Sequence, residues 1–117
     1  MLHIRKGQME LLKQNELRKF VERVMSHLRN DFTEDVKEMS DEQLREFVET
    51  GIKTSKKYDV VNERDIQLYL DCMVIINPEF DRDSKVPWAQ KILNKKDIDG
   101  RAKMAQISEY LVFGWSS

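Results

Sequence analysis

The segment YDVVNERDIQLYLDCMVIINP, residues 58–78, carries the strongest fold signal in the chain. Asn62 is a favoured N-cap, and the acidic residues that follow it lie where the helix dipole stabilises negative charge. The apolar positions after them are Ile66, Leu68, Tyr69, Leu70, Met73, Val74 and Ile76. Asn77 precedes Pro78, and a residue before proline avoids the helical region, so we expect the helix to end there. This pattern predicts the most apolar and central helix of the fold.

The segment N-terminal to this helix, residues 8–32, predicts a long amphipathic helix. From Leu17 onward the apolar residues are separated by steps of three and one, which places them on one helical face: Leu17, Phe20, Val21, Val24, Met25 and Leu28. Leu11 and Leu12 belong either to this helix or to a short preceding one, because Asn15 could cap a fresh start.

Residues 33–58 predict one helical turn and then a second amphipathic helix. TEDVKEM, residues 33–39, is polar and long enough for a single turn. Ser40 with Gln43 three residues later forms a capping box, so we expect the helix to begin there. Gly51 lies inside the apolar pattern, where it costs about 1 kcal/mol relative to Ala. That cost suggests a close helix contact at Gly51.

Two further helices are predicted towards the C-terminus. Pro87 suits the first position of a short helix over residues 86–97, whose buried face is formed by Trp88, Ala89, Ile92 and Leu93. A last helix runs through residues 99–113, with Met104, Ile107, Tyr110 and Leu111 as its apolar stripe. We expect Asp97 to cap this helix.

These elements predict an all-α fold: one domain over residues 1–117, built as an irregular or orthogonal bundle of five or six helices. The length of 117 residues is that of one ordinary domain. Only 4 glycines and 2 prolines are present, and no segment alternates with the period of a strand. Residues 113–117 are expected to form a tail.

The stretch NPEFDRDSKVPWAQKIL, residues 77–93, could be a calcium loop, an active-site segment or a corner between helices. An EF-hand that starts at Asp81 would place Val86 at the required glycine and Ile92 at the required glutamate, and a start at Asp97 fits no better. We therefore expect a corner in which Asp81 or Asp83 caps a turn and Phe80 and Trp88 are buried.

Composition and motifs argue against several classes of function. The formal net charge is −1 and the charges are interleaved, so we expect no nucleic-acid binding. Cys72 lies in the most apolar helix, where a small buried residue is the expected role, and neither His3 nor His27 belongs to a metal or catalytic motif. We expect no enzymatic activity, no cofactor, no metal and no membrane span, and a cytoplasmic location.

Four aromatic residues are the candidate protein-binding residues. Trp88 with Phe80 would form an interface anchor if Trp88 were partly exposed, and Phe113 with Trp115 forms a second candidate contact near the C-terminus. Spacing alone does not decide between burial and binding for any of them. Homo-oligomerisation is also left open.

Residues 51–93 resemble a group of small bacterial accessory proteins encoded beside type VI secretion spike (VgrG or PAAR) and effector genes. The features that carry this resemblance are Phe20, HLR at 27–29, Gly51-Ile52, Tyr58, NERD at 62–65, Phe80-Asp81, Pro87-Trp88-Ala89, Ile92-Leu93 and Lys103-Met104. The similarity covers roughly residues 2–112. The chain departs from the group at Asp31-Phe32-Thr33, where a Phe-Pro corner is expected.

The resemblance implies a binding protein that handles an effector or a spike component. The leading expectation is a type VI secretion-associated adaptor or chaperone. The first alternative is an immunity protein that neutralises a co-encoded toxin, and a second alternative is a small hydrolase. The hydrolase would need a cleft with two carboxylates of raised pKa.

Overall fold

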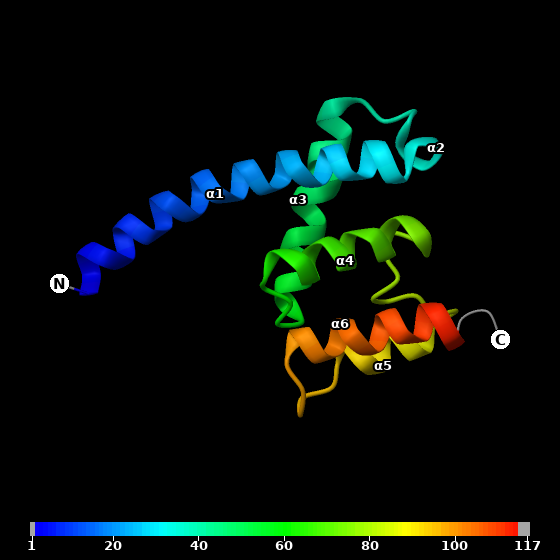
Figure 1. Cartoon of the computed structure of the whole chain (residues 1–117). Helices are drawn as coiled ribbons and strands as arrows, with labels where there is room; N and C mark the ends of the chain where they lie inside the picture. Colours follow the sequence, from blue (N-terminus) through cyan, green and yellow to red (C-terminus); the bar gives the residue numbers. More distant parts are fainter. Residues whose placement is uncertain (1, 115–117) are drawn as a thin grey trace. The chain divides into compact units, whose positions relative to one another are not determined.

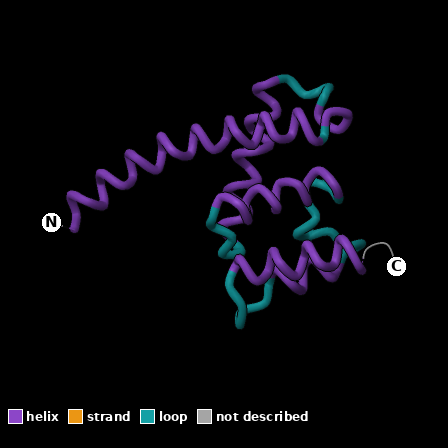
Figure 2. Tube along the Cα trace, viewed as in Figure 1, coloured by secondary structure: helices purple, strands orange, loops and turns teal. Residues whose placement is uncertain are grey.

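The structure is a computed structural model that describes the backbone of residues 2–114 and the side chains of residues 14–112. All regular structure in the described backbone is helical, as Figures 1 and 2 show, and this confirms the all-α class. The elements are α1 (Leu2–Asp31), α2 (Thr33–Val36), α3 (Asp41–Lys57), α4 (Glu63–Ile75), α5 (Pro87–Leu93), α6 (Gly100–Glu109) and the π-helical η1 (Tyr110–Gly114).

The chain divides into two compact units, residues 1–48 and residues 49–117, with the boundary inside α3. The expectation of one domain stays a prediction. Of the expected tail, Phe113 and Gly114 belong to η1, and residues 115–117 lie outside the described residues.

In the first unit, α1 is one continuous helix through Asn15, so no fresh helix starts there. The Asn15 side chain instead accepts a hydrogen bond from Arg18 Nη2 at 3.3 Å. The predicted apolar stripe is buried from Phe20 onward, while Leu17 is 40% exposed. The expected single turn after α1 is α2, which packs against α1.

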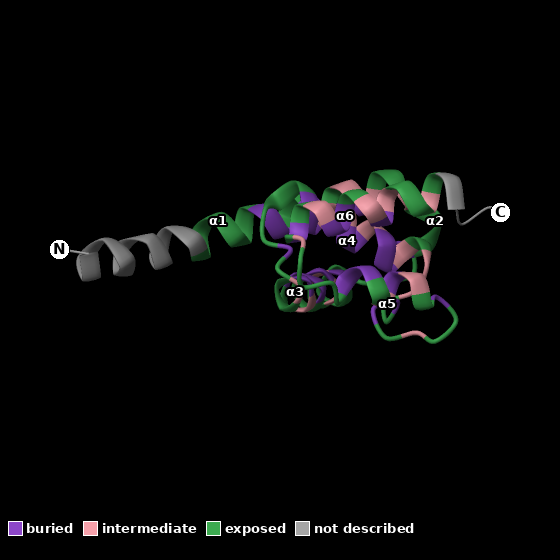
Figure 3. Ribbon diagram, turned by 90° about the horizontal axis from the view of Figure 1, so that it is seen from below, coloured by how far each residue is buried: buried purple, intermediate pink, exposed green. Residues whose placement is uncertain are grey.

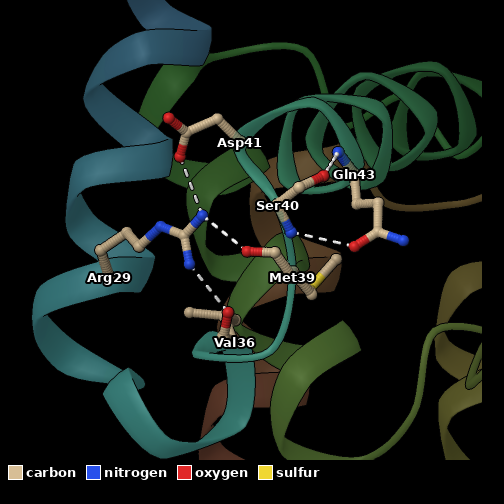
Figure 4. Close-up of polar contacts among 6 residues, drawn as sticks. All are labelled: Arg29, Val36, Met39, Ser40, Asp41 and Gln43. Atoms are coloured by element: carbon tan, nitrogen blue, oxygen red, sulfur yellow. Dashed lines mark hydrogen bonds and ion pairs between the residues drawn. The ribbon is translucent and has the colours of Figure 1, made fainter.

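The start of α3 is formed by the predicted capping box, shown in Figure 4. Ser40 N donates to Gln43 Oε1 at 2.9 Å, and Gln43 N donates to Ser40 Oγ at 3.1 Å. Together these bonds satisfy two amide groups that the first turn leaves without helical partners. This local sequence signal therefore sets where α3 begins.

The guanidinium of Arg29 holds the link between α2 and α3 against α1 (Figure 4). It donates to the Val36 carbonyl at 2.8 Å, to the Met39 carbonyl at 2.9 Å and to Asp41 Oδ1 at 2.9 Å. A planar fork of donors suits this arrangement, because one side chain reaches acceptors in several directions. Arg29 is thus a positioning residue of the first unit.

In the second unit, α4 is capped as predicted, with Asn62 Oδ1 accepting from Asp65 N at 2.9 Å. The helix ends at Ile75, just before Asn77-Pro78. Both α4 and α5 pack against α6, and Figure 3 shows the buried residues along these helices. The core of this unit includes Ile66, Tyr69, Leu70, Cys72, Met73, Ala89, Ile92, Leu93, Met104 and Ile107.

Gly51 lies where α3 and α4 approach each other closely, as the sequence suggested. A Cβ built at Gly51 would lie 2.7 Å from Met73 Sδ and would also overlap the Leu70 side chain. Glycine therefore removes bulk at a helix contact, which explains a residue that is otherwise unfavourable inside a helix.

Gly100 lies where the start of α6 meets the backbone that follows α3. A Cβ at Gly100 would lie 2.8 Å from Val60 Cα and would also meet the carbonyl group of Asp59. Asp59 has a φ of 66°, and Val60 N donates to the Ser55 carbonyl at 3.1 Å, which together form a Schellman-type helix end. The Lys103 side chain is buried and donates to the Tyr58 carbonyl at 2.9 Å.

The predicted cap of the last helix is wrong by two residues. Asp99, and not Asp97, accepts from Ala102 N at 2.9 Å. An N-cap must directly precede the first helical residue, and the close approach of Gly100 to Asp59 puts that first residue at position 100.

Candidate protein-binding groove

The corner between α4 and α5, residues 76–86, is tied to itself by polar contacts. Asp83 accepts from Lys85 N at 2.9 Å and from Asn77 Nδ2 at 2.7 Å, which confirms that it caps a turn. The Lys85 amide, and then the Asn77 side chain, lower the pKa of Asp83. Glu79 N donates to Asn77 Oδ1 at 2.8 Å. The acidic corner is therefore organised by hydrogen bonds within the chain.

Asp81 has a different role, because its side chain is buried. Its Oδ2 accepts a hydrogen bond from the Tyr58 hydroxyl at 2.7 Å, which ties the corner to the end of α3. Burial, together with this hydrogen bond, raises the pKa of Tyr58 to about 12. Among the residues that the structure describes, no group of three or more His, Cys, Asp or Glu side chains could hold a metal ion.

Phe80 lies in the interior of the second unit. Its side chain is fully buried, and its ring centroid lies 4.9 Å from that of Tyr69. Phe80 therefore pins the corner, as expected, and the structure places it away from any surface that a partner could reach.

Trp88 differs from the expectation of a buried core residue, because the structure leaves it partly exposed. Ala89, Ile92 and Leu93 form the buried face of α5, and Trp88 lies at the edge of that face. Its ring stacks on Tyr110, with 4.2 Å between centroids and 11° between planes. Tyr110 was expected in the apolar stripe of the last helix, but it is 39% exposed. The two rings form an aromatic pair at the surface.

This aromatic pair lines a groove between α5 and α6 with a volume of about 540 Å³. Trp88, Lys91 and Ile92 line it from α5, with Lys95 just beyond the end of that helix. The other rim comes from α6 and η1, through Gln106, Glu109 and Tyr110. Figure 1 shows α5 and α6 running side by side, which creates these two rims.

The charges of the groove are only partly used by the chain itself. Lys95 Nζ donates to the neutral Gln106 side chain at 3.0 Å. Within the side chains that the structure describes, Lys91 and Glu109 make no hydrogen bond or ion pair. The groove therefore combines an apolar aromatic surface with charges of both signs on its rims.

A second pocket, of about 390 Å³, lies in the first unit and has a different character. Its charged side chains pair with one another, Arg29 with Asp41 at 2.9 Å and Arg45 with Glu22 at 4.0 Å. Because these pairs occupy the charges, this pocket offers less to a partner than the α5–α6 groove does.

Phe113 and Trp115 are the two sequence candidates near the C-terminus. The side chain of Phe113 and the whole of Trp115 lie outside the described residues. The structure therefore brings together Trp88 with Tyr110, and it does not bring Phe80 into the same surface.

The remaining candidates for chemistry have local structural roles. Cys72 is buried as predicted, and burial raises the pKa of its thiol to about 12, so the reactive thiolate is disfavoured. His27 Nδ1 lies 3.2 Å from Asp31 Oδ2, and the His27 ring packs edge-on against Phe32. His3 lies outside the described side chains. In the described part of the chain, no helix has the length and apolar character needed to cross a membrane.

Sequence reasoning named Trp88 but missed the rest of the groove. Lys91 and Lys95 are four residues apart, a spacing that would place two cations on one side of the helix predicted over residues 86–97, although α5 ends at Leu93. Tyr110 could not be assigned to the groove, because its apolar spacing matched a buried stripe equally well. Pairing Trp88 with Tyr110 needs the antiparallel return of α6 along α5, which no local signal contains.

Comparisons with protein-family models, with curated protein sequences and with solved structures found no match.

Proposed function

We propose that this chain is a non-enzymatic protein-interaction module, an adaptor or chaperone of type VI secretion that binds an effector or a spike component. The observation that carries the binding function is the stacked pair of Trp88 and Tyr110 in the lining of a groove. Tryptophan and tyrosine are enriched among the residues that dominate interface energies, especially where they border a pocket that a partner can fill. The assignment to type VI secretion rests on the sequence resemblance.

The geometry of the pair favours recognition of a partner surface. The two rings hold each other in one orientation, so less conformational entropy is lost when a partner docks than for two separate flexible side chains. Ile92 is 8% exposed and extends the apolar surface along the groove. A stable complex would bury about 800 Å² on each partner, so the groove would form the anchor of a larger contact.

The groove offers few groups for bond-making chemistry. Among the described side chains, Glu109 is the one carboxylate of the lining, and none of the lining residues is Ser, Thr, Cys or His. The two carboxylates of the second pocket each pair with an arginine. These features support a binding role over the hydrolase alternative.

The test is co-expression of the tagged full chain with each spike and effector protein encoded beside it. We expect one of these proteins to co-purify in a defined complex, and Trp88→Ala to weaken the complex at least about tenfold, since a central anchor contributes about 2 kcal/mol or more. Ile75→Ala is the matched control, because Ile75 is 51% exposed in the same unit but does not line the groove.

Two outcomes would contradict the proposal. Binding to a toxin that blocks its activity and restores growth on co-expression would indicate an immunity protein instead. Failure of every spike and effector protein to bind the folded chain would overturn the adaptor function altogether.

A further inference from the structure

We propose that the α5–α6 groove takes an acidic, apolar segment of a protein partner, with large apolar side chains on the Trp88–Tyr110 pair and carboxylates on Lys91 and Lys95. This inference rests on the proposed function and specifies the chemistry of the partner. It follows from the distribution of charge, apolar surface and volume around the groove.

The charge argument begins with the two lysines. Lys91 is exposed and has no acidic partner among the described side chains, and Lys95 bonds only to the neutral amide of Gln106. Glu109, the one acid among the described lining residues, belongs to the opposite rim. A carboxylate that docks beside Lys91 gains a charge-assisted hydrogen bond without breaking an existing ion pair.

The surroundings of these lysines strengthen such a contact. An apolar partner surface that covers Trp88, Ile92 and Tyr110 excludes water from the groove, and a charge pair at the edge of a dry interface is screened less than one in open solvent. Because the lysines line one rim and Glu109 the other, the charges also select the direction in which a segment lies.

The volume of the groove sets the size of what it holds. A volume of about 540 Å³ is within the range of about 300–1,000 Å³ typical of ligand pockets, enough for more than one large side chain. Short amphipathic segments supply two such side chains on one face, at positions separated by three or four residues in a helix. An acidic amphipathic segment therefore matches the groove in both size and charge.

Single-stranded nucleic acid is the main rival occupant, since aromatic rings beside lysines also bind stacked bases. Two observations disfavour it here. Trp88 and Tyr110 stack on each other, which uses one face of each ring, and Glu109 next to Tyr110 would repel phosphates. The net charge of −1 supplies no wider electrostatic attraction for a polyanion.

The experiment uses two short, fluorescein-labelled helical peptides with the same leucine and phenylalanine positions, one flanked by glutamates and the other by lysines. Binding to the full chain is measured by fluorescence anisotropy, and the site by the NMR signal of the Trp88 indole. We expect the acidic peptide to bind at least about tenfold more tightly than the basic one, with affinity that falls as salt rises from about 50 to 300 mM.

Lys91→Glu should weaken binding of the acidic peptide about tenfold and strengthen binding of the basic peptide, whereas Lys53→Glu should change neither affinity by more than about twofold. Lys53 is the matched control, because it is an exposed lysine of the same unit that does not line the groove, so both variants alter the net charge equally. Far-UV circular dichroism checks that both variants remain folded.

Several results would overturn the inference. These are equal binding of the two peptides, an equal effect of the two lysine variants, tighter binding of a thymidine oligonucleotide than of the acidic peptide, or self-association of the chain that Trp88→Ala abolishes. A secretion component that binds regardless of Lys91→Glu would refute this inference and leave the proposed function intact. If the acidic peptide binds selectively but no secretion component binds, the proposed function is refuted and the inference about the groove stands.

Discussion

Replacing Gly100 by alanine tests the close approach of the start of α6 to the backbone that follows α3. The added Cβ would lie 2.8 Å from Val60 Cα and would also overlap the carbonyl group of Asp59. Both neighbours are main-chain atoms, so no side chain can rotate away to relieve the overlap. The start of α6 and the end of α3 must therefore move apart.

The cost follows from what that movement disturbs. Overpacking costs about 1–3 kcal/mol. The same shift strains the hydrogen bond from Lys103 to the Tyr58 carbonyl and that from Val60 N to the Ser55 carbonyl, each with a net contribution of about 1 kcal/mol. Lower entropy of the unfolded chain offsets about 0.4–1 kcal/mol. We expect a net loss of about 2–4 kcal/mol in the free energy of unfolding.

Urea unfolding followed by tryptophan fluorescence measures this loss, because Trp88 belongs to the second unit and its fluorescence reports on the unfolding of that unit. At this chain length the midpoint of thermal unfolding should also fall by roughly 10 °C. Ala105→Gly is the control: it changes an exposed residue of α6 and should cost only about 1 kcal/mol through helix propensity. A Gly100→Ala protein as stable as the wild type would refute the close backbone contact.

Four further predictions follow from individual contacts. Gly51→Ala gains about 1 kcal/mol of helix propensity, but its Cβ would overlap Met73 at a cost of about 1–3 kcal/mol. Urea unfolding should therefore show a net loss of stability near 1 kcal/mol, and a stabilised variant would contradict the close contact. Arg29→Lys loses the donor fork to two carbonyl groups, and the melting curve should show a loss of about 1–2 kcal/mol, whereas an unchanged curve would refute the positioning role. Because the pKa of Tyr58 is raised to about 12, the Tyr58 hydroxyl ionises first in the unfolded chain, and the free energy of unfolding falls as the pH rises from about 10 to 12. Urea titrations at pH about 9 and about 11 should therefore show a smaller loss of stability for Tyr58→Phe than for the wild type. Trp88→Ala should cost about 1–2 kcal/mol, from stacking and partial burial, and a loss above about 3 kcal/mol would indicate a core residue.

Local signals in the sequence predicted much of the secondary structure. The capping box of Ser40 and Gln43, the cap at Asn62 and the start at Pro87 are all observed where the residues indicated them. Each depends on contacts within a few residues, so it can be read from spacing alone. The error at Asp97 has the opposite origin, because a contact between α6 and the end of α3 selected Asp99 instead.

The candidate site was predicted less completely than the helices. Trp88 was expected to be buried, and its partial exposure was left as the alternative, because helical spacing indicates which side of a helix a residue is on and not how far the neighbouring helix covers it. The protein-binding role of Trp88 stays a prediction. For Phe113 and Trp115 the described residues add nothing to the expectation.

The sequence by itself determined the helical class, most helix starts and the burial of residues such as Phe80 and Cys72, because these depend on local hydrogen bonding and on apolar periodicity. Only the tertiary structure decided that Trp88 meets Tyr110 and that Lys91 faces a groove without an acidic partner among the described side chains. Residues more than twenty positions apart meet only after α6 has folded back along α5, and the free energy of that packing is spread over the whole core.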